Sequence, residues 1–166
     1  MEAAILETER IIESGGSEVD LVMPYRPWLA GDTDFAMETI SAVKSACGGS
    51  VVLKVIIETG ALGGIAEIGN ASRDAIEAGA DFVKTSTGKI PVSATPEAAR
   101  AMLEVIATCG RPVGFKAAGG IRTVAEAREY TRIAAEIMGP AYLAPATFRL
   151  GASSLLDAIL QEHGAA

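Results

Sequence analysis

Two lysines lie near the ends of short apolar segments, where a charged side chain is unusual. Lys84 belongs to DFVKTS (81–86) and Lys116 to PVGFKA (112–117). Small residues follow each of them, TSTG after Lys84 and AAGG after Lys116. Because an unpaired ammonium group is costly to desolvate, a lysine in a buried strand calls for a charged partner or a chemical role.

Two such lysines side by side have a specific chemical use. A lysine with a pKa near 10.4 is only about 0.04% neutral at pH 7, whereas one with a pKa near 7 is about half neutral. Burial and a second cation both lower a lysine pKa. Period-2 geometry puts Lys84 opposite Val83 and Lys116 opposite Phe115, so both lysines face inward if Val83 and Phe115 face outer helices. The alternative is that the lysines reach past the strand ends and serve only as surface charge.

Three more polar residues lie in the two earlier apolar segments, EVDLVM (18–23) and VVLKVIIE (51–58). The same parity argument turns Asp20, Lys54 and Glu58 inward, where they could form a proton relay around the lysines. Alternatively, Lys54 and Glu58 form an ion pair within one strand. If the sheet forms a barrel, the Asp20 carboxylate lies inside it and needs a partner of opposite charge, which the lysines provide.

Two glycine-containing loops suggest an anion site. AAGGIRT (117–123) precedes one expected helix and GASS (151–154) opens another. Backbone N–H groups at helix N-termini, approached through glycine, bind anions without net positive charge. The candidate phosphate-binding residues in these loops are Gly119, Gly120, Gly151, Ser153 and Ser154. Either glycine cluster alone could mark only a tight turn.

The elements that must position these residues follow from hydrophobic periodicity. Helices are expected at about 3–14, 33–46, 65–78, 96–108, 124–137 and 154–162, and strands at 18–23, 51–58, 81–86, 112–117 and 147–152. Thr95 before Pro96, and Thr123 with Glu126, predict helix starts. The PYRPW segment (24–28) is expected to be a packed loop.

Alternation of strands and helices predicts an α/β protein with a parallel sheet. Five βα units fit an open, doubly wound sheet of flavodoxin type, which length alone favours. They also fit part of a (β/α)₈ TIM barrel, which typically needs about 250 residues. The inward lysines and the anion site in the last two loops favour the partial barrel.

Composition narrows the function classes. The 166 residues are 49% hydrophobic and 21% charged, which predicts one globular domain over 1–166 that resides in the cytoplasm and has no membrane segment. A net charge of −7 argues against nucleic-acid binding. Cys47 and Cys109 lie outside any CxxC motif, so no metal site or disulfide is expected. No GxGxxG motif follows a first strand, and no cofactor is predicted.

Several segments together resemble one enzyme family. At DFVKTSTGK (81–89), VGFKAAGGIR (113–122), EVDLVMPYR (18–26), VVLKVIIETG (51–60) and RLGASSLL (149–156), the chain is similar to class I, bacterial-type deoxyribose-phosphate aldolases. The resemblance covers almost the whole chain, and its KTSTG and GFKxAGG motifs are highly specific. It implies a (β/α)₈ barrel and metal-independent, reversible cleavage of 2-deoxy-D-ribose 5-phosphate to D-glyceraldehyde 3-phosphate and acetaldehyde, in deoxynucleoside catabolism.

The resemblance also implies residue roles. By position, Lys84 resembles the lysine that forms the Schiff base, Lys116 the lysine that lowers its pKa, and Asp20 the carboxylate that relays protons. Lys54 and Glu58 could support these three. The residues that resemble the phosphate-binding set are Thr87, Gly88, Lys89, Gly119, Gly120, Ser153 and Ser154.

The chain departs from the family pattern at both ends. Family members carry three further βα units, with an additional active-site aspartate, before the helix that opens this chain, and some carry a tyrosine-bearing tail where it reads QEHGAA. We therefore expect a partial barrel made of the family's strands 4–8, with a water-exposed inner face and open edges that promote a homo-oligomer or self-association. Two alternatives remain: an impaired fragment that retains only phosphate binding, and an unrelated five-stranded nucleotide- or phosphate-binding module.

Overall fold

The protein is described by a computed structural model that covers residues 1–151, 153–162 and 164, and its strands form one parallel sheet. The strands lie in chain order, β1-β2-β3-β4-β5, and each pairs in parallel with the next. Their bounds are β1 (Glu18–Val22), β2 (Val52–Ile56), β3 (Phe82–Lys84), β4 (Gly114–Ala118) and β5 (Phe148–Gly151).

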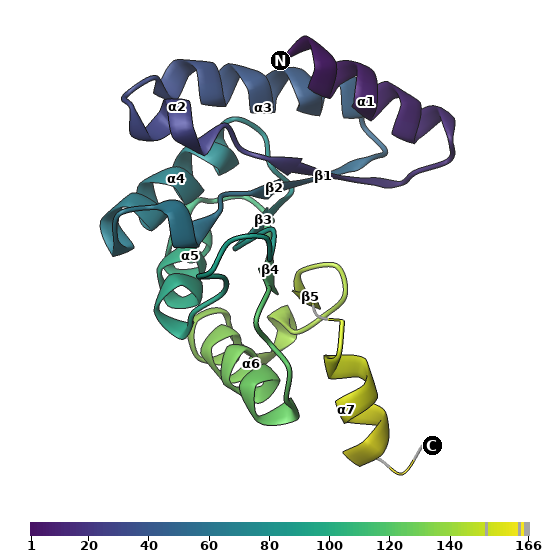
Figure 1. Ribbon diagram of the computed structural model, residues 1–166, viewed down its shortest axis with the longest axis vertical. Coiled ribbons are helices and arrows are strands. Elements are labelled where there is room, and N and C mark those ends of the chain that lie inside the picture. Colours follow the sequence, from purple (N-terminus) through teal and green to yellow (C-terminus); the bar gives the residue numbers. More distant parts are fainter. Residues whose placement is uncertain (152, 163, 165–166) are drawn as a thin grey trace.

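Helices cover the outer side of the sheet and leave its inner side bare (Figure 1). Their bounds are α1 (Glu2–Glu13), α2 (Tyr25–Leu29), α3 (Thr33–Cys47), α4 (Ile65–Glu77), α5 (Pro96–Thr108), α6 (Val124–Met138) and α7 (Leu155–Glu162), with short 3₁₀ turns η1 (Thr59–Ala61) and η2 (Pro140–Tyr142). Helices α3, α4, α5 and α6 follow one another around the arc, and α1 packs on α3. Among the helices so described, none is both long and apolar enough to cross a membrane.

Strand order separates the two architectures considered for the sequence. A flavodoxin-like sheet has the order 2-1-3-4-5, with helices on both faces. Here the order is sequential and the helices lie on one side, so the sheet curves into an arc of a barrel (Figure 1). The prediction of a partial (β/α)₈ barrel is confirmed, and the doubly wound alternative is wrong.

Local signals explain where the helices begin. The Thr95 hydroxyl accepts a hydrogen bond from the backbone N–H of Ala98, 3.1 Å away, at the start of α5. Thr123 and Glu126 form the expected reciprocal capping box at the start of α6. The caps thus fix the starts of the helices that follow β3 and β4.

The PYRPW segment differs from the prediction of a loop, because Tyr25–Leu29 form the short helix α2. Its anchor is Trp28, which is buried and whose indole N–H donates to Asp74 Oδ2 on α4 at 2.7 Å. The long-range partner stabilises a turn that has no strong helical pattern of its own.

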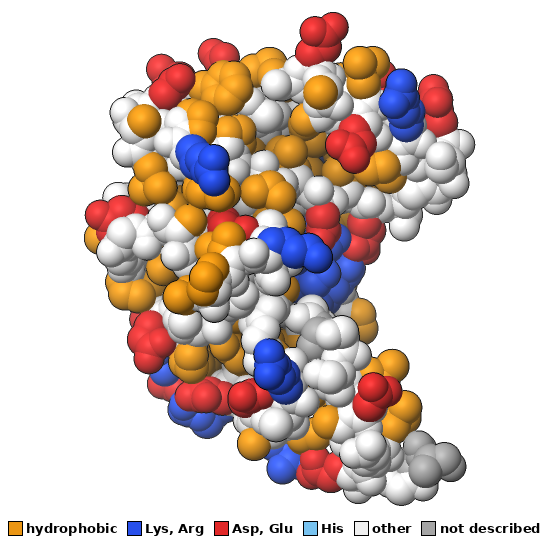
Figure 2. Space-filling model, in the orientation of Figure 1, with side chains coloured by type: hydrophobic (Ala, Val, Ile, Leu, Met, Phe, Trp, Pro, Cys, Tyr) orange, Lys and Arg blue, Asp and Glu red, His pale blue; other side chains and the backbone are white. Residues whose placement is uncertain are grey.

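The alternation of side chains across the strands follows the prediction. Val83 and Phe115 are fully buried on the side that packs against the helices. Lys84 and Lys116, one residue further along, therefore lie on the inner side of the arc. The main core lies between sheet and outer helices, and the polar residues occupy the concave side, which Figure 2 shows as a hollow with basic and acidic side chains at its centre.

One glycine shapes the inner side beneath the lysines. Gly114 on β4 is the register partner of Phe82 on β3, and a Cβ atom at Gly114 would lie only 2.3 to 2.5 Å from three atoms of the Phe82 ring. Phe82 is 4% exposed. The missing side chain therefore lets this ring lie across the inner surface of the sheet.

We expect Gly114→Ala to lower the free energy of unfolding by about 1–3 kcal/mol, because the added methyl overlaps the Phe82 ring. Gly69→Ala in α4 is the matched control: its Cβ would meet only Val105 Cγ2 at 3.9 Å, and alanine favours a helix over glycine by about 1 kcal/mol. Urea unfolding of both variants measures the difference. Equal stability of the two variants would contradict the packing described for Phe82.

Candidate active site

The two lysines singled out by the sequence are direct neighbours on adjacent strands. Lys84 on β3 is the register partner of Lys116 on β4, and neighbouring strands lie about 4.8 Å apart. Just beyond them, the Thr85 hydroxyl accepts from the Ala118 N–H at 3.0 Å and donates to the Ala118 carbonyl at 3.1 Å. This side chain extends the contact between the strands at the level of the lysines and fixes their alignment.

Asp20 on β1 binds the first lysine of this pair. Lys84 Nζ donates to Asp20 Oδ2 at 2.6 Å, and Lys54 Nζ lies 3.1 Å from Asp20 Oδ1. Burial acts to raise the pKa of Asp20, but the hydrogen bonds from the two lysines outweigh it and hold the pKa below its usual value. The carboxylate is therefore ionised at neutral pH, between two ammonium groups.

The pKa of Lys116 depends on its burial and on the charges around it. Burial, and then the positive charge of Lys84, lower the pKa of Lys116. Gly151 on β5 leaves room for the side chain, since a Cβ atom there would lie 2.9 Å from Lys116 Cε. The pair thus combines partial burial with a like-charged neighbour.

The predicted alternative of an ion pair between Lys54 and Glu58 is wrong. Lys54 Nζ binds Glu18 Oε2 at 2.6 Å as well as Asp20. Strand β2 ends at Ile56, and Glu58 has a left-handed φ of 54° that turns its carboxylate toward the next loop. There it accepts from the backbone N–H of Thr87 at 3.1 Å and from its hydroxyl at 2.5 Å. Glu58 therefore holds the loop after β3 in place.

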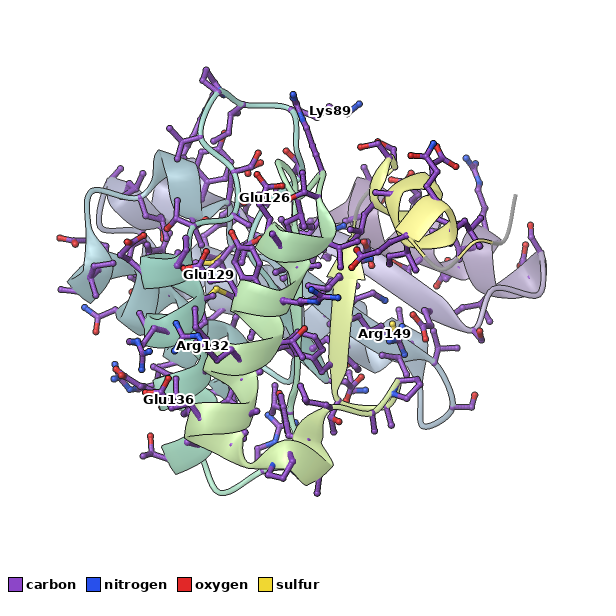
Figure 3. All side chains as sticks on the ribbon, turned by 90° about the horizontal axis from the view of Figure 1, so that it is seen from below. Lys89, Glu126, Glu129, Arg132, Glu136 and Arg149 are labelled. Carbon is purple, nitrogen blue, oxygen red and sulfur yellow. The ribbon has the colours of Figure 1, made fainter. Side chains whose placement is uncertain are left out.

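An ion pair that sequence reasoning missed links the first and last strands. Arg149 Nη1 on β5 donates to Glu18 Oε2 on β1 at 2.6 Å, and the guanidinium lies over the Phe82 ring, 4.7 Å from its centroid. Figure 3 shows Arg149 on the side of β5 that is turned away from α6. Glu18 lies two residues before Asp20 in β1, and Arg149 lies two residues before Gly151 in β5. Because side chains two residues apart in a strand share a face, the sequence could have placed Glu18 and Arg149 on the inner face.

The inner face is less open than expected. The side chains of Lys54 and Lys84 are only 4% and 13% exposed, and Glu58 is buried. The strong curvature of the sheet, with Arg149 and Glu18 meeting across it, covers Lys54, whereas Glu58 lies under the Thr87 loop. Asp20, at 36%, retains contact with solvent. The predicted exposure of Lys54, Glu58 and Lys84 is thus wrong.

A depression of about 490 Å³ joins the lysine pair to the glycine loops. It is lined by Lys84, Thr87, Gly88, Lys116, Ala118, Gly119, Gly120, Ile121, Arg122, Gly151, Ser153 and Ser154. The structure therefore brings the predicted phosphate-binding residues together, apart from Lys89. Sequence reasoning missed Arg122, a cation in the same loop as Gly119 and Gly120.

The glycines of this depression are needed for its shape. Gly119 and Gly120 have φ of +86° and +83°, a region that L side chains rarely adopt. A Cβ atom at Gly119 would also lie 2.7 Å from Ser93 Cβ and 3.2 Å from Gly88 Cα. The two loops approach each other backbone to backbone, and Ser153 and Ser154 lie just before α7. Lys89 is exposed and extends beyond the start of α6 (Figure 3).

Taken together, two adjacent amines and a glycine-rich loop cluster line one hollow, and an ionised carboxylate binds one of the two amines. In the described ranges, no three His, Cys, Asp or Glu side chains lie close enough together to hold a metal ion. The chemistry of the donors present suits covalent capture of a carbonyl by an amine, beside an anionic handle.

Comparison with known proteins identifies relatives over nearly the full chain. A family model described as "DeoC/LacD family aldolase" matches residues 2–161. The deoxyribose-phosphate aldolase of Agrobacterium fabrum is 53% identical over 156 residues, which cover 94% of this chain and 60% of that protein. The chain thus spans less than two thirds of the length of that relative.

Solved structures agree with this result. A protein from Coccidioides immitis designated a deoxyribose-phosphate aldolase superimposes with a TM-score of 0.82 and 34% identity, covering 96% of this chain and 57% of that one. An apo-form structure with the same designation from Toxoplasma gondii gives a TM-score of 0.90 and 25% identity, covering 99% and 66%.

The ionic contacts of the site predict a distinct response to acid. The hydrogen bonds from Arg149 and Lys54 lower the pKa of Glu18 from 4.5 to about 2. A carboxyl group with a lowered folded-state pKa stabilises the fold above its unfolded-state pKa, and this contribution is lost as the pH falls through the folded-state value. The free energy of unfolding should therefore fall between about pH 4.5 and 2, and fall less for Glu18→Gln. Urea unfolding at several pH values tests this, and parallel curves would refute it.

Proposed function

The chain belongs to the DeoC/LacD family of aldolases, and on that premise we propose that its concave site is that of a Schiff-base aldolase acting on 2-deoxy-D-ribose 5-phosphate. The observation that carries the proposal is the direct pairing of Lys84 with Lys116 across β3 and β4, with Asp20 Oδ2 2.6 Å from Lys84 Nζ. Phosphate binding alone would not require this arrangement.

We propose that the loop cluster binds the phosphate group of the sugar. Gly119, Gly120 and the Ser153 and Ser154 segment before α7 line the hollow beside the lysines, and Arg122 adds a positive charge. Thr87 and Gly88 lie on the opposite loop. The bound phosphate group would hold the sugar so that its carbonyl end reaches Lys84.

Lys84 is the proposed nucleophile. In the cleavage direction, its neutral amine adds to the C1 aldehyde of the open-chain sugar, and loss of water gives a protonated imine. Removal of the C3 hydroxyl proton breaks the C2–C3 bond, releases glyceraldehyde 3-phosphate and moves the electron pair into an enamine. Protonation of the enamine carbon and hydrolysis of the imine then release acetaldehyde and regenerate the amine.

Asp20 and Lys116 would prepare the nucleophile. Burial and the positive charge of Lys84 lower the pKa of Lys116, so Lys116 can lose its proton more readily than a free lysine. Asp20 is the adjacent acceptor for a proton that leaves Lys84. Because the pKa of Asp20 is itself low, we expect it to pass that proton on to water rather than keep it.

Assembly of this chain is also a proposal. Within the part of the chain that the structure describes, β1 and β5 each have a strand neighbour on one side only, and such edges are templates for pairing with another chain. Val22 on β1 is 41% exposed, and Leu156 on α7, the helix that follows β5, is 61% exposed. We propose that the chain self-associates through this region.

Covalent labelling tests the proposed nucleophile. Treatment with acetaldehyde and borohydride should add an ethyl group at Lys84, which peptide mass spectrometry can locate, and Lys84→Leu should abolish the adduct. Lys116→Leu should retain the adduct but form it at higher pH, by about one unit or more, since a neighbouring cation is lost.

The matched control is Lys44→Leu, which removes a lysine paired with Asp81 at the outer side of the sheet and should leave labelling of Lys84 unchanged. Labelling confined to lysines other than Lys84 would reject the proposed nucleophile. An unchanged pH profile in Lys116→Leu would remove Lys116 from the activating role.

A charge placed in the loop cluster tests the phosphate handle. Gly120→Asp should weaken use of 2-deoxyribose 5-phosphate by tenfold or more, because it sets a carboxylate beside the phosphate, while unphosphorylated 2-deoxyribose should be affected far less. Gly120→Asn is the control, since it has the same shape and shares the strain of a positive φ but carries no charge. Equal losses for both sugars, measured as kcat/KM, would show that the phosphate binds elsewhere.

A further inference from the structure

A continuous chain of ionic contacts crosses the inner side of the arc. It runs from Arg149 to Glu18 at 2.6 Å, from Glu18 to Lys54 at 2.6 Å, from Lys54 to Asp20 at 3.1 Å, and from Asp20 to Lys84 at 2.6 Å. We call these five residues the ionic chain. It connects β5 with the proposed nucleophile on β3 by way of β1 and β2.

Lys54 is the shared link of the ionic chain. Its side chain is 4% exposed, and its single ammonium group binds one oxygen of Glu18 and one of Asp20. The ammonium lies nearer to Glu18, at 2.6 Å, than to Asp20, at 3.1 Å, and a shift toward one carboxylate lengthens its contact with the other. Since Asp20 also holds Lys84, the position of the Lys54 ammonium controls how much of the Asp20 charge is left for Lys84.

Arg149 sets the strength of the Glu18 contact. Its guanidinium and the Lys54 ammonium bind the same carboxylate oxygen, Oε2 of Glu18. Arg149 is itself fixed, because its Nε donates to the Pro145 carbonyl at 2.8 Å and its guanidinium stacks on Phe82. The two cations therefore share one acceptor oxygen. If either cation is removed, Glu18 binds only the other one.

We propose that Glu18 and Arg149 are positioning residues that divide the Lys54 ammonium between two carboxylates and thereby set how readily the lysine pair loses a proton. This inference deepens the proposed function and rests on it for its use in catalysis. Neither side chain lines the hollow in which the substrate would bind, so both act through Lys54 and Asp20.

The two positioning residues should act in opposite directions. Without the Glu18 charge, Lys54 moves wholly to Asp20, the hold of Asp20 on Lys84 weakens, and the inner face becomes more positive. Both effects favour proton loss from the lysine pair. Without the Arg149 charge, Glu18 draws Lys54 away from Asp20, Asp20 holds Lys84 more strongly, and one cation near the pair is gone.

The remaining charged groups near the pair do not reverse these signs. Lys116 faces Lys84 from β4, and Arg122 lines the same hollow from the loop after β4. The Glu58 carboxylate is taken by the Thr87 N–H and hydroxyl. Burial and Lys84 lower the pKa of Lys116 most, and Lys54 and Arg149 act in the same direction.

Trace acetylation as a function of pH tests the proposal, because it reports proton loss from each lysine amine without requiring aldolase chemistry. The extent of acetylation at Lys84 and Lys116 is read by peptide mass spectrometry in the full chain. We expect the profile to move to lower pH in Glu18→Gln and to higher pH in Arg149→Met, each by about one unit, or about tenfold in acetylation rate at neutral pH. The double variant should lie between them, near the wild type.

Two further variants separate positioning from a general structural effect. Arg149→Lys keeps the charge and should restore most of the wild-type profile. Lys44→Met breaks the Lys44–Asp81 pair, which has the same 2.6 Å distance and a similar exposure of 29% and 31%, against 30% and 34% for Arg149 and Glu18. It should leave both acetylation profiles unchanged.

Shifts of Glu18→Gln and Arg149→Met in the same direction would overturn the proposal, because that is the result of simple destabilisation. Shifts no larger than that of Lys44→Met would overturn it as well. If the wild-type Lys84 forms no adduct with acetaldehyde, the proposed function fails. Opposite acetylation shifts in the same samples would still support the positioning role.

Discussion

The charges on the inner side of the arc must neutralise one another, and the rest of the site depends on this constraint. The side chains of Lys54 and Lys84 are only 4% and 13% exposed, which leaves their ammonium groups little water, so each needs a partner of opposite sign. The ionic chain from Arg149 to Lys84 meets that need and joins the ends of the sheet. It requires a strongly curved sheet and the flat Phe82 ring, which in turn requires Gly114.

Much of this arrangement could be predicted from the sequence, because strand periodicity is a local property. Val83 and Phe115 indicate which side of the sheet is buried against the helices, so Lys84 and Lys116 must lie on the other side. The helix starts at Thr95 and Thr123 could also be predicted from nearby residues, because a helix cap involves only one side chain and the first turn of the helix. Periodicity could not decide between an open sheet and a barrel; there the prediction came from the chemistry of the lysines and loops.

What the sequence did not predict depends on distance along the chain or on unusual backbone. Glu18 and Arg149 are 131 positions apart, and only the curvature of the sheet brings them together. Glu58 continues the parity of Lys54, but its left-handed φ ends the alternation and sends its carboxylate to Thr87. α2 likewise depends on the distant partner of Trp28. In each case a tertiary contact overrides the local pattern.

The two lysines, although neighbours, meet different surroundings, and this difference explains a division of labour. Lys84 donates to a carboxylate that is bound to a second ammonium, so its proton has an acceptor at 2.6 Å and a route to solvent through the partly exposed Asp20. Lys116 lies on the far side of this contact, where burial and the Lys84 charge lower its pKa. The amine beside the acceptor suits covalent attack, and its neighbour suits a purely electrostatic role. An acidic chain of net charge −7 can in this way concentrate positive charge in one hollow, where a phosphorylated sugar would bind.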